Sequence, residues 1–320
     1  MLSPMPLALS RSTPFRRLQS RIGGSTYRLN TVLVGLEEIA VGGGGAGPVA
    51  VKWPKPKTFD KARQAANQAR IFACASALVL GADVFDSFLR EFASEEWLGF
   101  AIETRAIATK AKTRPKEEGG GYSMAERAEA LCADLGLEDP IRIAALDLLA
   151  KWRNVVAHSS DRRTRLTADR RRTLTDAASK EYFHFDIALA LKNFEGRRVP
   201  VPKEVTHLVA IAVNFSRQID EPAIRRAAPT PDKMFAAAQQ MLREYFRASP
   251  ERPCSPWSEL ADAWQGGGTR RRNMLEKFLA NVGIAETQTP VSAPLPERFM
   301  EETVSLSRDD FARRFEIAQP

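Results

Sequence analysis

The residues best suited to chemistry stand in one short stretch, residues 151–158, which reads KWRNVVAH. On a helix, Asn154 and His158 are four residues apart and share a face, and Lys151 falls on the same face. Arg153 points about 140° away from His158 on an ideal helix. The two can converge only through the long arginine side chain, a loosened helix end or a second protomer. An imidazole, an amide and two cations together suit phosphodiester chemistry without a metal.

A run of arginines follows this stretch. Between residues 161 and 172 there are two aspartates and six arginines, namely Arg162, Arg163, Arg165, Arg170, Arg171 and Arg172. Such a run is usually a solvated face, and a track for a nucleic-acid backbone is the functional alternative. The whole chain carries a net charge of +8, mostly from arginine, which pairs with phosphate in a bidentate manner. These charges favour a negatively charged partner, most simply nucleic acid.

Predicted helices position this stretch. Asp139 followed by Pro140 predicts the start of the helix that carries it, with an aspartate N-cap and proline at the first helical position. Apolar residues at three- and four-residue spacing predict a long amphipathic opening helix over residues 62–92. Ser123 and Glu126 form the pattern of a capping box. Further helices are predicted at about 96–112, 168–193, 203–219, 231–246, 258–265 and 269–281.

The N-terminal region has a different pattern. Residues 27–41 mix β-branched and apolar side chains, and residues 49–53 alternate, with a glycine-rich loop between them. This pattern predicts two short strands in a flexible arm over residues 1–58. Its first part is typical of a disordered extension, with an organellar transit peptide as the alternative. Residues 59–225 are expected to form a helical bundle, and residues 226–320 a small helical C-terminal unit. The predicted fold class is mainly α with a small β-containing N-terminal segment.

The cysteine and histidine content narrows the classes of protein further. The three cysteines, Cys74, Cys132 and Cys254, are far apart in sequence and form no CxxC pair or disulfide framework. This pattern fits a reducing compartment, and we therefore expect a cytoplasmic protein. With only three histidines, we expect neither a metal site nor a cofactor. His184 and His207 lack an arginine five to seven positions upstream, and we interpret them as structural. No run of about 18 apolar residues predicts a membrane span.

Arg153-Asn154-x-x-x-His158 resembles the R-polar-x-x-x-H signature of the HEPN superfamily, over about residues 59–220. The resemblance implies an up-and-down helical bundle that is usually a homodimer. The catalytic members are metal-independent endoribonucleases of toxin–antitoxin, CRISPR-associated and phage-defence systems. Their hydrolase site maps onto Arg153, Asn154 and His158.

For this chain the resemblance implies attack of the RNA 2′-hydroxyl on phosphorus, which gives a 2′,3′-cyclic phosphate and a 5′-hydroxyl. His158 would be the general acid or base, Arg153 would hold the phosphate oxygens, and Asn154 would orient the histidine or the ribose. Lys151 and the arginine run would bind the RNA, and an antitoxin or defence-system protein is a possible partner. Two alternatives stay open: a catalytically inactive HEPN-like protein that binds nucleic acid or a partner, and a basic helical DNA-binding regulator.

Overall fold

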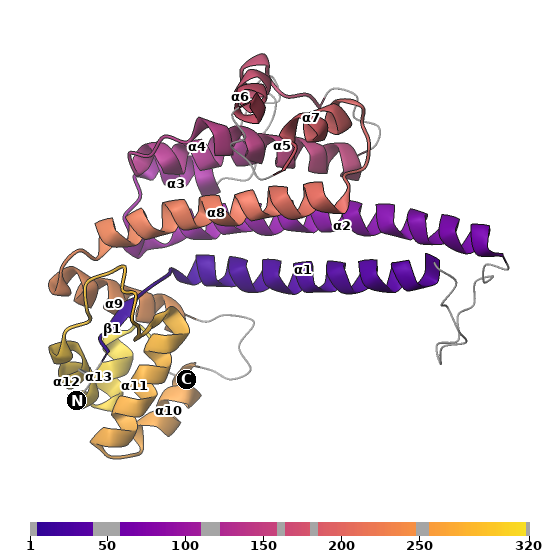
Figure 1. Ribbon diagram of the computed structural model, residues 1–320. Coiled ribbons are helices and arrows are strands. Elements are labelled where there is room, and N and C mark those ends of the chain that lie inside the picture. Colours follow the sequence, from indigo (N-terminus) through magenta and orange to yellow (C-terminus); the bar gives the residue numbers. More distant parts are fainter. Residues whose placement is uncertain are drawn as a thin grey trace. The chain divides into compact units, whose positions relative to one another are not determined.

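The computed structural model describes residues 5–40, 58–109, 122–158, 164–179, 185–247 and 256–317. These residues form helices and one two-stranded sheet, which confirms the predicted mainly α fold with a small β-containing N-terminal segment. In chain order the described elements are β1 (Leu7–Leu9), α1 (Thr13–Ala40), α2 (Phe59–Ser94), the 3-10 helix η1 (Glu96–Leu98), α3 (Ile102–Thr109), α4 (Met124–Asp134), α5 (Pro140–Ala157), α6 (Ala168–Ser179), α7 (Ile187–Glu195), α8 (Pro202–Ala227), α9 (Pro231–Phe246), α10 (Pro256–Trp264), α11 (Gly268–Val282), β2 (Ile284–Glu286), α12 (Glu297–Ser305) and α13 (Arg308–Arg314) (Figure 1).

Helix starts that were predicted from caps are confirmed. The Ser123 hydroxyl accepts a hydrogen bond from the Glu126 amide at 3.2 Å, and the Glu126 carboxylate accepts one from the Ser123 amide at 2.6 Å. Asp139 caps α5 by accepting from the Arg142 amide at 2.9 Å, with Pro140 at the first helical position. These local side-chain bonds satisfy amides that the helix itself leaves unpaired, which is why sequence alone predicts them.

The strand predicted over residues 27–41 is wrong for residues 27–40, which belong to α1, whereas residue 41 lies outside the described residues. Phe15, Leu18, Ile22 and Leu29 recur along this helix at helical spacing and are buried. Their packing outweighs the weak strand preference of the β-branched residues that follow. The observed sheet pairs β1 with β2 antiparallel instead. The second predicted strand, residues 49–53, lies outside the described residues.

Two predicted helices are divided. The helix expected at 96–112 begins as η1, which ends at Gly99 with a φ of 64°, and the chain restarts as α3. Such a positive φ favours glycine and ends helices. The helix expected at 168–193 is described as α6 and α7, and Asp186 caps the second by accepting from the Leu189 amide at 2.8 Å. Helix α8 continues past Ile219 to Ala227, through Pro222.

The chain divides into two compact units. The long-helix unit contains described residues from 17–90 and 106–216, and the terminal unit contains those from 5–16, 91–105 and 217–317. This grouping differs from the predicted division at residues 58 and 225. Residues 91–105 belong with the C-terminal residues because Gln240 of α9 donates to Glu96 at 3.0 Å and the Arg226 guanidinium lies over the Phe100 ring.

Three long helices form the base of the long-helix unit. Within this unit α1, α2 and α8 run side by side, and α4 to α7 lie beyond α2 and α8 (Figure 1). Helices α2 and α8 approach closely at Gly81, where an added Cβ would lie 2.7 Å from a Val209 methyl group. Phe85 and Phe215 pack edge to face across the same pair, and both are fully buried.

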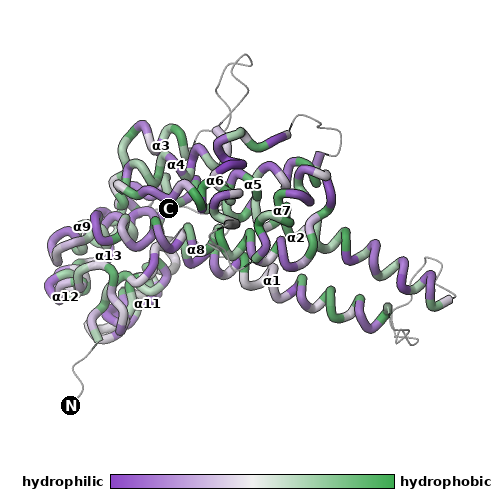
Figure 2. Tube along the Cα trace, turned by 45° about the horizontal axis from the view of Figure 1, so that its top comes forward, coloured by the Kyte–Doolittle hydropathy of each residue, from purple (hydrophilic) through white to green (hydrophobic). Residues whose placement is uncertain are grey.

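Helix α2 carries many apolar side chains although much of its surface is exposed. Hydrophobic residues recur along α1 and α2 (Figure 2). By length and composition α2 could cross a membrane, and it is the one such helix among the residues that the structure describes. About 33% of its most apolar stretch is buried, and the buried part includes core residues such as Leu78 and Phe85. Core helices of soluble proteins have the same length and composition, so these two features do not identify a membrane span.

The N-terminal residues are an integral part of the terminal unit. The β1–β2 ladder pairs Leu7 with Glu286 and Leu9 with Ile284, and the Leu9 amide donates to the Ser292 hydroxyl at 2.9 Å. The expectation of a flexible arm over residues 1–58 is therefore wrong for residues 7–16. The two strands are almost 280 residues apart in sequence, so no local sequence pattern predicts that they pair.

Candidate functional site

The 151–158 stretch occupies the end of α5, as predicted. Helix α5 ends at Ala157, and the His158 amide donates to the Asn154 carbonyl at 2.9 Å. His158 is therefore the residue that closes the helix, and its side chain is exposed. The preceding Trp152 is fully buried, packs edge to face on Phe194 and donates its indole N–H to the Arg198 carbonyl at 2.9 Å. This anchor fixes the last turn of α5 and with it the side chains next to Trp152.

Arg153 is held by two polar neighbours. Its Nε donates to Asp83 Oδ1 at 3.1 Å, its Nη2 lies 3.0 Å from the same oxygen, and its Nη1 donates to Asn154 Oδ1 at 3.0 Å. A guanidinium carries five N–H donors, so these contacts leave two N–H groups for another acceptor. The Arg153 side chain is 30% exposed, which keeps those groups within reach of solvent.

Asp83, on α2, is the partner of Arg153 that the sequence did not indicate. Its side chain is 52% exposed and pairs with Arg153, while Asp86 pairs with Arg90 and with the buried Arg127. Arg153 and Asp83 are 70 residues apart in sequence, and no motif links them. Only the packing of α5 against α2 brings their charges together.

Lys151 is engaged elsewhere on α5. Its ammonium lies 3.0 Å from the carboxylate of Asp147, one turn earlier. Asp147 is buried, and burial raises the pKa of its carboxyl while Lys151 acts to lower it. The lysine that was predicted to bind RNA thus forms an ion pair with a buried carboxylate of its own helix.

The predicted arginine track is largely paired with carboxylates. Arg170 forms an ion pair with Glu129, Arg171 with Glu195 at 2.6 Å, and Arg172 with Asp169 at 2.7 Å. Arg162 and Arg163 lie outside the described residues, so their part of the prediction stays a prediction. These pairs are mostly exposed, and exposed pairs are weak enough for a phosphate to compete with them.

Arg165 lies in a different setting. It is exposed and lines a cavity of about 560 Å³ with Thr164, Arg171, Arg197 and Glu195. Three guanidinium groups and one carboxylate line this cavity, so its lining carries a net positive charge. It also borders Phe194, on which Trp152 of α5 packs. The cavity is therefore linked through one buried aromatic contact to the helix that carries Arg153.

The remaining histidine that the structure describes has structural contacts. The His207 ring stacks on Phe185 at 5.0 Å, and its Nδ1 lies 2.7 Å from the Lys203 carbonyl. His184 lies outside the described residues. Within the described ranges, no three histidine, cysteine or acidic side chains group as metal ligands.

No family model, curated protein or solved structure matches this chain. The chemistry of the site therefore follows from its own contacts. An arginine oriented by a carboxylate and an amide stands five residues before an exposed imidazole at the end of the same helix. The contacts of the Arg153 guanidinium among the described residues are with Asp83 and Asn154, and none joins it to the His158 imidazole. An arginine can bind an anionic oxygen and an imidazole can transfer a proton, and cleavage of a phosphodiester uses both.

Proposed function

We propose that this protein is a metal-independent endoribonuclease with its catalytic residues at Arg153, Asn154 and His158, and that it acts as a toxin or phage-defence effector. The observation that supports the proposal is the Arg153 guanidinium, which is held by Asp83 and Asn154 and has two N–H donors that these described contacts do not use. An arginine fixed in this way loses little conformational entropy when it binds a phosphate. His158 follows at the exposed helix end, where a polymer can reach it.

The proposed reaction needs only an acid–base group and a cation. The ribose 2′-oxygen forms a bond to the adjacent phosphorus while the bond from phosphorus to the 5′-oxygen breaks. The 2′-hydroxyl loses its proton and the leaving 5′-oxygen gains one, so that a 2′,3′-cyclic phosphate and a 5′-hydroxyl result. The His158 imidazole would carry one of these proton transfers, and Arg153 would stabilise the charge on the non-bridging oxygens.

RNA affinity would come from the basic surface beyond the helix end. Arg165 in the cationic cavity is the strongest candidate, and Arg170, Arg171 and Arg172 would exchange their carboxylate partners for phosphate. Lys151, paired with the buried Asp147, would contribute less.

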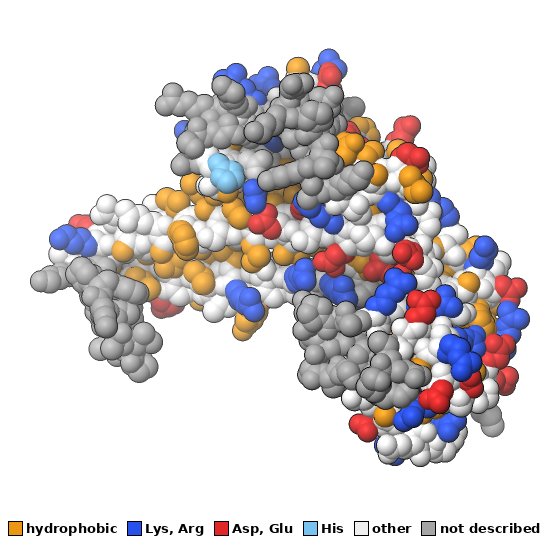
Figure 3. All heavy atoms as spheres, turned by 180° about the vertical axis from the view of Figure 1, so that it is seen from behind, with side chains coloured by type: hydrophobic (Ala, Val, Ile, Leu, Met, Phe, Trp, Pro, Cys, Tyr) orange, Lys and Arg blue, Asp and Glu red, His pale blue; other side chains and the backbone are white. Residues whose placement is uncertain are grey.

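We further propose that the active form is a homodimer. The His158 side chain is exposed, and a group from a second copy of the site would orient its imidazole for proton transfer. Phe72 and Leu80 lie on the same face of α2 as Asp83, and their exposed fractions are 73% and 45%. Apolar side chains also gather along the long helices in Figure 3. A two-fold contact over this face would bring two copies of the site together.

The dimer is tested with Phe72→Glu. We expect this variant to shift the protein toward monomer in sedimentation analysis and to lower cleavage in parallel, because a charge would lie in the interface. Tyr27→Glu on α1 is the matched control, since Tyr27 is 74% exposed against 73% for Phe72. A wild-type protein that is monomeric and fully active would refute the dimer and leave the nuclease intact.

Cleavage is tested with RNA in excess EDTA, followed by analysis of the ends produced. We expect cyclic phosphate and 5′-hydroxyl ends, and a loss of at least about 10²-fold in rate for His158→Ala and for Arg153→Ala. His207→Asn and Arg313→Ala are the controls and should retain activity, because the Arg313 side chain is 79% exposed and has no role in the proposed site. A folded His158→Ala protein that cuts RNA at the wild-type rate would overturn the proposal and favour the inactive nucleic-acid or partner-binding alternative.

A further inference from the structure

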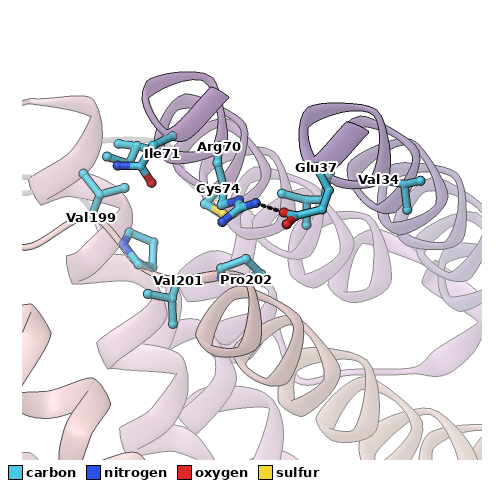
Figure 4. Close-up of a pocket in the computed structure, with 11 residues that line it drawn as sticks. Val34, Glu37, Arg70, Ile71, Cys74, Val199, Val201 and Pro202 are labelled. Carbon is cyan, nitrogen blue, oxygen red and sulfur yellow. Dashed lines mark hydrogen bonds and ion pairs between the residues drawn. The ribbon is translucent and has the colours of Figure 1, made fainter. Parts of the chain in front are cut away.

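A second cavity in the long-helix unit has no role in the proposed reaction. It lies between α1, α2 and residues 199–202, which lead into α8, and its volume is about 540 Å³ (Figure 4). This volume falls within the roughly 300–1,000 Å³ range of small-molecule sites. The pocket-lining residues of α2, including Ile71 and Cys74, point away from the Asp83 face on an ideal helix. The cavity and the proposed nuclease site therefore use different faces of α2.

The walls of this cavity are aliphatic. They include Leu33, Val34, Ile71, Val199 and Val201, with Pro200 and Pro202 beside them. Val34, Ile71 and Val201 are 65%, 45% and 46% exposed. Clustered exposed aliphatic side chains mark binding sites, because covering them with an apolar group releases water from their surface.

The wall formed by residues 199–202 is fixed in place. Buried Glu204 accepts a hydrogen bond from the Val201 amide at 2.8 Å and another from the Asn193 side chain at 2.7 Å. Pro200 and Pro202 restrict the backbone on either side of Val201. A ligand would therefore meet a formed wall and would not have to order it, which favours binding.

A polar cavity of about 510 Å³ adjoins the apolar one. Both cavities are lined by Glu37, Asn67 and Arg70, and the polar one adds Asp60, Arg63 and Gln64. Arg70 of α2 and Glu37 of α1 form an ion pair where the two cavities share their lining, and Figure 4 shows it at the edge of the apolar cavity. Apolar space beside charged space matches a molecule that is itself amphiphilic.

The charged lining consists of two arginines, Arg63 and Arg70, and two carboxylates, Asp60 and Glu37, so an anionic head group binds by displacing a carboxylate from an arginine. Burial raises the pKa of the Cys74 thiol, so the floor of the apolar cavity stays neutral. The Arg70 side chain is 37% exposed and lines both cavities, whereas its partner Glu37 is 64% exposed. An exposed pair of this kind is weak, so Glu37 can turn to water while a ligand anion takes its place on Arg70, with Arg63 close by.

We propose that this double cavity binds a single-chain amphiphile whose apolar chain lies against Val199, Val201 and Ile71 and whose anionic head, a carboxylate or a phosphate, pairs with Arg70. The proposal does not depend on the nuclease activity. It assigns α1 and α2 a ligand site on the face away from Asp83.

The test is calorimetric titration of the full-length protein with decanoate below its micellar concentration at pH 7.5. Decyl phosphate, decyl maltoside and decyltrimethylammonium serve as anionic, neutral and cationic comparisons. We expect both anions to bind, and to bind more tightly than the neutral and cationic amphiphiles. Val201→Glu should weaken decanoate binding at least about tenfold, because it places a carboxylate in the apolar cavity. Leu189→Glu is the matched control, since Leu189 and Val201 are both 46% exposed.

Arg70→Leu separates the head group from the chain. This variant should weaken decanoate binding and leave decyl maltoside binding unchanged. Equal binding of all four amphiphiles, or no difference between Val201→Glu and wild type, would overturn the proposal. So would a change from oligomer to monomer caused by Val201→Glu and not by Leu189→Glu, because a second copy would then be the occupant of this face.

Discussion

Asp220 is a buried acid whose ionisation should loosen the N-terminal segment. It is completely buried in the terminal unit, and its carboxylate accepts a hydrogen bond from the Ser12 amide at 3.1 Å. Burial raises the pKa of this carboxyl from 3.8 to about 7, with the Ser12 hydrogen bonds and Arg11 acting in the opposite direction and Glu221 adding to the rise. The protonated acid is therefore the form that the folded segment prefers.

The sign of the effect follows from proton binding. Between pH 4 and 7 the folded segment holds a proton that the open segment releases, so its stability falls as the pH rises through this range and is constant above it. One proton is worth about 1.4 kcal/mol per pH unit. From pH 5 to 7 the opening free energy should therefore fall by about 2.5 kcal/mol at most, which is close to a hundredfold in protection from hydrogen exchange.

The assay is hydrogen exchange of the amides of Leu9 and Ser12, corrected for the intrinsic pH dependence of exchange. Asp220→Asn keeps an acceptor for the Ser12 amide and removes the ionisation, so its corrected protection should not change between pH 5 and 8. Asp232→Asn is the control in the same unit, because the Asp232 side chain is 80% exposed and should leave the wild-type slope in place. A wild-type protein whose protection is constant over this range, or an Asp220→Asn variant with the same slope, would refute the reasoning.

Two further predictions concern ion pairs of α2. Asp86→Ala should destabilise the protein by about 3–5 kcal/mol in urea unfolding, because it leaves Arg127, only 5% exposed, without its carboxylate. Asp169→Ala in α6 is the control: it removes the 83% exposed partner of Arg172 and should lower the free energy of unfolding by less than about 0.5 kcal/mol. Asp83→Ala should leave folding intact and lower RNA cleavage by at least about tenfold, mainly in kcat, because Arg153 loses the carboxylate that positions it. An unchanged kcat would mean that Asp83 plays no part in positioning.

The sequence by itself determined the local features of this protein. Helix α5 could be predicted because Asp139 and Pro140 cap its start, and the positions of Asn154 and His158 at its end follow from helical periodicity. Capping bonds and turn spacing depend on neighbours within a few residues, so they can be read directly. The mainly α fold class follows from the same periodicity.

Tertiary structure decided what depends on distant partners. The strand preference of residues 27–40 gave way to a helix because Ile22 and Leu29 pack in the core of the long-helix unit. The packing of α2 against α5 pairs Asp83 with Arg153. Lys151 forms an ion pair with the buried Asp147. A charge in sequence carries no information about which opposite charge, tens of residues away, will neutralise it. That choice is made only when the helices pack, because burial penalises every charge left without a partner.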